Sequence, residues 1–480
     1  MISRLQYSLI TVVLLLVLYS CNKEDFFTDS DVKLAFGTDT VTFDTVFTTI
    51  GSTTKYFTVK NPYKQPVLIS KIFLAGGENS RFRLNINGIQ ANEDFDVEIG
   101  GGDSLFIFVE VTIDPNGQNN PMIVHDSVVF NLNGNQQDVD LIAFGQDFHL
   151  FNGEVIKTQH WQNDKPYLIY NSVLVDTLET LTIDEGCRIH FHKGSSLFVK
   201  GTLKANGTFK KKITFAGDRL EKSYEDVPGQ WGAVRIFESG GIYVYGGIHF
   251  LVGSKDNLLD WVVLKNAYKG IQIDSMGFSD NPVLAISNSR IENMTLNCID
   301  ARTTFLKASN CVFANSGSYI VALLFGGNYE FNHCTIANFY NFGTRKEPSL
   351  ILNNYYEYNK TIYSFDFKAS LINCIIYGSN PDEISVDKSG DKSFVYFFRN
   401  CLVNTSLEEG FENSVFNKNP LFIDIPENNF AIDSLSPARN IGNIEIAELF
   451  PFDLDNQSRL DDEGPDLGAL EWIPTAKRKK

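Results

Sequence analysis

The chain has 480 residues, with a formal net charge of −17 at pH 7 and a pI near 4.9. This charge excludes nucleic acid or another polyanion as the main partner unless a cation bridges the two. The length predicts two or three domains.

The first 21 residues have the pattern of a secretion signal. Arg4 precedes an apolar core from Leu9 to Leu18, which is too short to span a bilayer. The core ends in Leu18-Tyr-Ser-Cys21, which resembles a bacterial lipobox, and the resemblance implies a lipid on Cys21. The following Asn22-Lys-Glu-Asp25 resembles the surface-export signal of Bacteroidetes lipoproteins. We therefore expect an outer-membrane lipoprotein exposed at the cell surface, with the membrane as a partner through Cys21; an uncleaved anchor helix is the alternative.

Residues 22–40 are predicted to be a tether, and residues 41–150 a β-sandwich. About seven short runs of β-branched and aromatic residues, such as Val41–Phe47, alternate with Gly, Asn and Pro. The motif Val59-Lys-Asn-Pro62 and the later Gly76-Gly77 resemble an immunoglobulin-like domain of the ASPM/SPD-2/Hydin type. Such a resemblance implies a spacer or an interaction module.

Residues 151–414 are predicted to form a parallel β-helix. Inward-alternating runs such as Leu181-Thr-Ile183 are separated by glycines, and Pro228-Gly-Gln-Trp231 follows them. This order resembles the right-handed parallel β-helix lipoproteins of Bacteroidetes, which implies a pectin-lyase-like solenoid. The predicted fold class is therefore all-β.

One short phrase recurs six times in this region, and its copies start 27, 22, 23, 40 and 27 residues apart. Such a period is typical of a solenoid, and the alternation inside each copy predicts a strand with one buried face. The copies are Val262-Val-Leu-Lys-Asn266, Ser289-Arg-Ile-Glu-Asn293, Cys311-Val-Phe-Ala-Asn315, Cys334-Thr-Ile-Ala-Asn338, Cys374-Ile-Ile-Tyr-Gly378 and Cys401-Leu-Val-Asn404.

Stacked coils place like residues above like, about 4.8 Å apart. We expect an inward ladder of thiols that stay mostly reduced, since parallel Cβ vectors suit a disulfide poorly. We also expect an asparagine ladder at the turn, with side-chain amides bonded to each other along the axis. The predicted ladder residues are Cys311, Cys334, Cys374 and Cys401, and Asn293, Asn315 and Asn338.

The coil that begins at Cys334 is 40 residues long, against 23 for the coil before it. Its extra segment is rich in tyrosine and asparagine, which can stack on a sugar ring and bond its hydroxyls. Long loops on a rigid scaffold often hold function, although a loop folded onto the solenoid by its own aromatics would have the same composition. The predicted glycan-binding residues are Tyr340, Tyr355, Tyr356, Tyr358 and Tyr363.

The C-terminal residues 415–475 include Arg459 and Pro465-Asp-Leu-Gly-Ala-Leu-Glu471. Their order resembles the end of bacterial β-helix proteins of the choice-of-anchor Q type, which implies a segment that caps the last coil. Residues 476–480 are predicted to be a solvated basic tail.

No catalytic motif stands out. Residues 151–414 lack the paired-carboxylate strings of polygalacturonase-like hydrolases. His190 and His192 share one side of a strand without an evident third ligand, so no metal and no cofactor is expected. Outward charges, such as Arg290 with Glu292 and Lys307, come one at a time.

The interpretation is a lipid-anchored, monomeric β-helix protein with a binding or structural role, and binding of a polysaccharide is the preferred role. One alternative is a carbohydrate-active enzyme, either a polysaccharide lyase or a glycosidase. Another is a surface scaffold that binds a protein partner through the sandwich. Fold alone does not decide among them.

Overall fold

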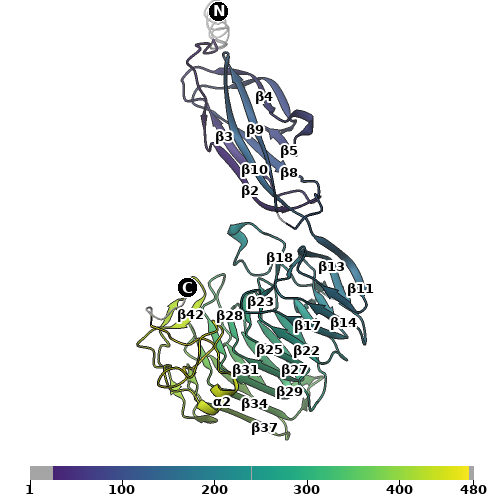
Figure 1. Cartoon of the computed structure of the whole chain (residues 1–480), viewed down its shortest axis with the longest axis vertical. Helices are drawn as coiled ribbons and strands as arrows, with labels where there is room; N and C mark the ends of the chain where they lie inside the picture. Colours follow the sequence, from purple (N-terminus) through teal and green to yellow (C-terminus); the bar gives the residue numbers. More distant parts are fainter. Residues whose placement is uncertain (1–24, 120, 239, 475–480) are drawn as a thin grey trace, which may run out of the picture. The chain divides into compact units, whose positions relative to one another are not determined.

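The computed structural model describes residues 25–119, 121–238 and 240–474 (Figure 1). The chain forms two compact units, Met1–Asp147 and Phe148–Lys480. Almost every regular element is a strand, which confirms the predicted all-β class. The predicted boundary after Leu150 falls inside β11 (His149–Ile156), shortly after this division. The predicted signal peptide with Cys21 and the basic tail lie outside the described residues.

The first unit is an immunoglobulin-like sandwich of two five-stranded sheets, with orders β1-β3-β8-β5-β6 and β2-β10-β9-β4-β7. Its core consists of the inward residues of both sheets, such as Leu105, Ile107 and Val109. The strands are β1 (Ala35–Phe36), β2 (Thr40–Phe47), β3 (Lys55–Lys60), β4 (Val67–Leu74), β5 (Phe82–Ile86), β6 (Ile89–Gln90), β7 (Glu93–Ile99), β8 (Ser104–Val111), β9 (Met122–Leu132) and β10 (Asn135–Gln146), with the short helix η1 (Gly77–Asn79).

The predicted tether 22–40 is corrected by the structure. Val32 and Leu34 are buried in the sandwich core, and β1 pairs with β3. Phe27 and Phe36 also pack against this core, and the polar residues between them hide this role in the sequence.

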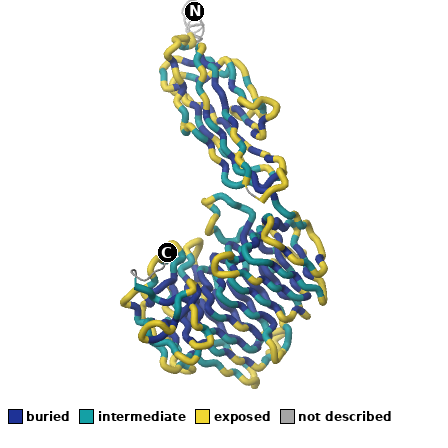
Figure 2. Tube along the Cα trace, in the orientation of Figure 1, coloured by how far each residue is buried: buried dark blue, intermediate teal, exposed yellow. Residues whose placement is uncertain are grey.

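The second unit is a parallel β-helix whose 26 strands pair coil upon coil. Each complete coil contributes to three faces, here named A, B and C. In the middle coils, β27 (Ile299–Ser309) and β29 (Val321–Asn332) turn the corner from face B to face C without a break. Figure 2 shows that buried residues line the interior of the stacked coils.

The remaining strands complete these faces. Residues of β11 and of β13 (Tyr167–Val175) begin faces A and B. Face A continues with β15 (Arg188–Phe191), β18 (Ile213–Gly217), β23 (Val262–Lys265), β26 (Arg290–Met294), β28 (Val312–Ser316), β30 (Thr335–Asn338), β35 (Ile375–Gly378), β38 (Leu402–Val403) and β40 (Val415–Phe416). Face B has β16 (Leu197–Val199), β21 (Ile248–Phe250), β24 (Ile271–Ile273), β31 (Leu350–Asn353) and β36 (Ile384–Asp387). Face C has β12 (Gln159–Trp161), β14 (Thr180–Ile183), β17 (Thr202–Asn206), β22 (Asn257–Asp260), β25 (Leu284–Ser287), β34 (Phe367–Ile372), β37 (Phe394–Arg399) and β39 (Phe411–Glu412).

Two hairpins and a short helical turn leave the coils. A hairpin of β19 (Val234–Ile236) and β20 (Ile242–Val244) lies between faces A and B, after the turn η2 (Lys222–Tyr224). A hairpin of β32 (Tyr355–Tyr358) and β33 (Thr361–Ser364) lies between faces B and C. In the part of the chain that the structure describes, no helix has the length and apolar character needed to cross a bilayer.

The thiols of Cys311, Cys334, Cys374 and Cys401 are fully buried and free. Each lies at the start of a face A strand, and each donates to the carbonyl two residues before it, at 3.1 to 3.4 Å. Ser289 makes the equivalent bond one coil earlier, from its hydroxyl to the carbonyl of Ser287 at 2.6 Å. The first residue of each of these copies therefore points into the solenoid.

The predicted asparagine ladder is wrong in its bonding. Asn293 donates to Asp226, Asn315 donates to Asn428, and Asn338 donates to the carbonyl of Ser316. The three amides find partners in other segments and in the neighbouring turn because they stand at the corner, where side chains diverge.

A ladder of left-handed residues exists one position before the thiols. Asn310 donates to Asn288 at 3.2 Å, and Asn373 bonds His333 at 2.9 Å. All four have φ between 48° and 55°, a region that asparagine tolerates well. The tight turn into each face A strand therefore selects these residues.

The C-terminal segment was predicted to cap the last coil, but its contacts are lateral. Its strands β41 (Phe422–Asp424) and β42 (Asn429–Ile432), its helix α2 (Ile444–Leu449) and its loops pack on the outward side of face A. Val312, Ile375 and Leu402 point outward there and are nevertheless buried. Apolar outward residues are stable only because this segment covers them.

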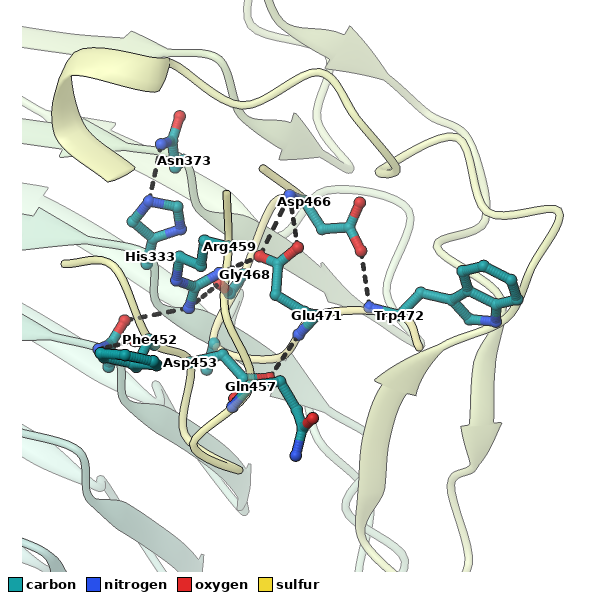
Figure 3. A network of polar contacts seen from close by, with 12 residues as sticks. His333, Asn373, Phe452, Asp453, Gln457, Arg459, Asp466, Gly468, Glu471 and Trp472 are labelled. Carbon is teal, nitrogen blue, oxygen red and sulfur yellow. Dashed lines mark hydrogen bonds and ion pairs between the residues drawn. The ribbon is translucent and has the colours of Figure 1, made fainter. Parts of the chain in front are cut away.

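A buried cluster of hydrogen-bonded polar side chains holds this segment in place (Figure 3). Arg459 is fully buried and pairs with Glu471. Its guanidinium also donates to Asn310 Oδ1 at 3.0 Å, which ties the segment to the turn ladder. Asp453 accepts from the backbone of Glu471 at 2.7 Å, and Asp466 from that of Trp472 at 2.7 Å. The C-terminal motif is therefore a structural lock in this protein.

Candidate functional site

An open groove of about 860 Å³ lies on the outward side of face C, near the corner with face B. Its floor follows from register: Asn328 in β29, Lys368 in β34 and Val395 in β37 stand side by side on successive coils. One wall is the loop between β24 and β25, which contributes Phe278, Ser279 and Asp280. Asp366 and Ser393 complete the lining, with Gly327 and Phe367.

The groove combines an exposed apolar surface with polar groups that lack partners. The ring of Phe278 is 61% exposed, and Val395 is 51% exposed. The side chains of Asp280, Asn328 and Lys368 make no hydrogen bond or ion pair with any residue that the structure describes. The arrangement can stack against a flat apolar surface while donating and accepting hydrogen bonds.

The tyrosine-rich insertion begins beside this groove. Tyr356 stacks on Tyr363 and on Phe365, with centroids 5.2 and 5.9 Å away, and meets Phe325 edge-on. Phe365 is the chain neighbour of Asp366, so the aromatic stack leads from the hairpin β32–β33 to the groove. Tyr358 is exposed at the hairpin tip.

The other two predicted tyrosines, Tyr355 and Tyr340, also contact the protein. Tyr355 donates from its hydroxyl to Asp387 at 3.0 Å, which anchors the hairpin. Tyr340 belongs to a second loop, between faces A and B, where it packs on Phe342. The extra length of the 40-residue coil is thus divided between two corners. The structure brings together Tyr355, Tyr356, Tyr358 and Tyr363 on one hairpin, and it places Tyr340 elsewhere.

The loop that holds Tyr340 is fixed by a buried ion pair. Arg345 pairs with Glu383, and both side chains are almost fully buried. Glu383 also accepts from the hydroxyl of Ser349 at 2.6 Å. Because both charges are buried and paired with each other, removing either partner would leave an uncompensated buried charge, so the contact fixes the loop.

The histidines singled out in the sequence have protein partners. His190 bonds the carbonyl of Gly217 at 3.0 Å, and burial lowers the pKa of this imidazole to about 4. His192 bonds Asp218 at 2.6 Å and stacks on Tyr170. Among the described residues no group of three or more His, Cys, Asp or Glu side chains could hold a metal ion.

The predicted outward charges form local pairs. Arg290 binds Glu292 at 2.8 Å and also donates to the carbonyl of Asn428, under the C-terminal segment. Lys307 binds Glu330 at 3.0 Å on the surface.

An ion network on face B was not anticipated from the sequence. Asp300 receives Lys269 at 2.7 Å and Arg302 at 2.8 Å. Burial opposes ionisation of Asp300, but the two cations outweigh it and hold the pKa of this carboxyl below its ordinary value. Tyr243 accepts from Gln272 and Arg302, which fastens the hairpin β19–β20. The carboxyl of Asp300 is paired with both cations, so the network positions that hairpin.

No family model matches the chain, and no curated protein matches it. Among solved structures, pectate lyase Pel9A is similar over 68% of this chain and 88% of that one, with 11% identity and a TM-score of 0.24. The PapD-like domain 7 of human CEP192 is similar over 27% of this chain and 94% of its own, with 11% identity and a TM-score of 0.18.

A family 123 glycoside hydrolase from Clostridium perfringens has 9% identity and a TM-score of 0.19; the match covers 28% of this chain and only 30% of the hydrolase. These likenesses are low, and we draw no functional argument from them. The strand order and register themselves define the class: the chain is a parallel β-helix protein with an N-terminal immunoglobulin-like sandwich.

Proposed function

We propose that this chain binds a carbohydrate polymer in the groove of face C, as a lipid-anchored protein of the outer membrane exposed at the cell surface. The observation that supports binding is an exposed ring, Phe278, opposite unpaired polar side chains at Asn328 and Lys368. The lipobox-like sequence before Cys21 supports the proposed location at the outer membrane.

The chemistry of the groove suits a sugar. A pyranose ring presents an apolar face to an aromatic side chain and polar hydroxyls at its edge. Asn328 offers both donor and acceptor groups, Lys368 offers donors, and Asp280 offers acceptors. The volume of about 860 Å³ lies within the range of small-molecule sites.

The adjoining hairpin favours a polymer over a single sugar. Its stack of Tyr356, Tyr363 and Phe365 continues from the edge of the groove, so further rings of one chain can contact it. A rigid aromatic surface costs little conformational entropy when it binds. The ligand is thus expected to run from the groove onto the hairpin.

Carbohydrate cleavage is the second candidate, because Asp280 and Asp366 line the same groove as Lys368. Carboxylates and an ammonium group are the groups that hydrolases and lyases use. A new reducing end, or a new carbon–carbon double bond, formed from a polysaccharide that the protein binds would identify this activity. Its loss in Asp366→Asn would assign it to the groove.

Binding is tested with the lipid-free chain, residues 22–480, on a glycan array and then by calorimetry with a bound glycan. Phe278→Ala is expected to weaken binding about tenfold, the factor for a loss of about 1.4 kcal/mol. Lys368→Ala is expected to act in the same direction. Phe342→Ala is the matched control, since Phe342 is 52% exposed on the loop that holds Tyr340. Unchanged affinity in both groove variants would refute the site.

A further inference from the structure

The sandwich has a patch of aromatic rings on the solvent side of a sheet, where alternation normally places polar residues. Tyr56 in β3 lies opposite Phe108 in β8, and Phe106 is two residues away. The three ring centroids are 5.9 to 6.4 Å apart. Tyr56 is 61% exposed and Phe106 is 44% exposed. This patch therefore presents a flat apolar surface without a cover.

Polar side chains stand in register beside the rings. The row that begins with Tyr56 and Phe108 continues across the sheet to Asn85 and Gln90. Phe108, Asn85 and Gln90, together with the next row, line a cavity of about 530 Å³, and Tyr56 lies beside Phe108 next to this lining. The next row holds Thr54, Arg83 and Glu110.

This cavity keeps hydrogen-bonding capacity for a ligand. Asn85 uses its carbonyl oxygen for the backbone of Gly88, which leaves the amide donors. Glu110 accepts from Thr54 through one oxygen, which leaves the other oxygen. Gln90 makes no side-chain hydrogen bond to any described residue. One guanidinium and one carboxylate give the cavity no net charge.

We propose that this face of the sandwich is a second carbohydrate-binding site, specific for neutral sugars. A hexose ring stacked on Tyr56 and Phe108 would reach the amides of Asn85 and Gln90 with its hydroxyl groups. Balanced donors and acceptors fit hydroxyls, which both donate and accept. The absence of a net charge in the cavity argues against an acidic sugar.

The polar composition of the cavity favours a sugar over a protein partner. A stable protein interface buries about 800 Å² on each side and has an apolar centre. Here one ring, Phe108, lines a cavity of about 530 Å³ in which polar side chains outnumber apolar ones. The proposed site involves none of the groove residues, so it does not rest on the function proposed for the solenoid.

The test is affinity electrophoresis of the lipid-free chain through gels that contain a neutral β-glucan, a xylan or a galactomannan. We expect retardation in at least one gel. Tyr56→Ala and Gln90→Ala are expected to weaken that retardation, Tyr56→Ala by about tenfold in apparent Kd. Phe95→Ala is the control, since it removes a ring that is 55% exposed on the other sheet. Phe278→Ala reports on the groove separately.

Three outcomes would overturn the inference. The first is migration of the wild type unaffected by all three polymers. The second is retardation that Phe278→Ala abolishes while Tyr56→Ala leaves it intact, which would place binding in the groove alone. The third is a dimer of the wild type that Tyr56→Ala dissociates, with no effect on retardation, which would make the patch a contact between two copies of the chain.

Discussion

The solenoid unit is expected to lose stability as the pH rises from 6.5 to 8, because its C-terminal segment buries more acid than base. Asp453, Asp466 and Glu471 surround Arg459, and all four are almost fully buried. Burial raises the pKa of Glu471 to about 8 in spite of Arg459, and the nearby Asp466 adds to the shift. The folded protein therefore keeps a proton on this carboxyl group near neutral pH.

The direction and size of this pH effect follow from the pKa of Glu471 in the unfolded and in the folded protein. The ordinary pKa of Glu471 is 4.5, and the folded value is higher, so its stabilisation is complete below pH 4.5 and is lost as the pH rises through 8. At about 1.4 kcal/mol per pH unit, the loss between pH 6.5 and 8 is about 2 kcal/mol. Asp453, whose pKa burial raises to about 6, has largely lost its proton before this window. His190, whose pKa burial lowers to about 4, adds stability as the pH rises, but most of this opposite contribution is gained below its ordinary pKa of 6.5.

Tryptophan fluorescence during urea unfolding reports on the solenoid unit, where Glu471 lies. All four tryptophans, Trp161, Trp231, Trp261 and Trp472, belong to residues 148–480. The wild type is expected to unfold at lower urea at pH 8 than at pH 6.5. Glu471→Gln keeps the shape but does not titrate, so its two midpoints should nearly coincide.

Glu412→Gln provides a control, because Glu412 is a surface partner of Arg399. It should keep the pH dependence of the wild type. Equal wild-type midpoints at the two pH values, or a Glu471→Gln variant as pH-dependent as the wild type, would refute the reasoning.

Three further predictions use other parts of the chain. Cys21→Ser is expected to move the protein from the membrane fraction to the soluble fraction; continued partition into detergent would exclude the lipid anchor. Cys334→Arg is expected to cost several kcal/mol of unfolding free energy through an unpaired buried charge, and Cys334→Ala only about 1–2, as measured by urea unfolding. Tyr355→Ala combined with Tyr356→Ala is expected to weaken binding of the groove's glycan by roughly 1–3 kcal/mol, with little change in the melting temperature; a stable variant with unchanged affinity would remove the hairpin from the site.

The repeated phrase was enough to predict the solenoid, because period and alternation are local properties of the sequence. The inward place of Cys334 follows from that alternation alone. The bonding of Asn315 does not, because its partner, Asn428, comes from a segment more than 100 residues away. The outward apolar residues Val312 and Leu402 were the available signal that something covers face A.

The groove could not be predicted in the same way. Phe278, Asn328, Lys368 and Val395 come from four separate stretches, and only the register of successive coils brings them together. The tyrosine count did indicate the neighbouring hairpin. It could not separate Tyr340 from the others, because composition does not show that the insertion leaves the solenoid at two corners.

The covering of face A also explains why the groove lies where it does. Coils of a β-helix have three outward faces, and a ligand can bind only where the backbone and its side chains stay accessible. The C-terminal segment covers face A, locked by Arg459 and Glu471. On face B the ion network of Asp300 fastens the hairpin β19–β20. Face C keeps an open floor, and its corner with face B is where the loop of Phe278 and the tyrosine hairpin leave the coils. Because the C-terminal segment covers face A, the walls of the groove form at the corner between faces B and C.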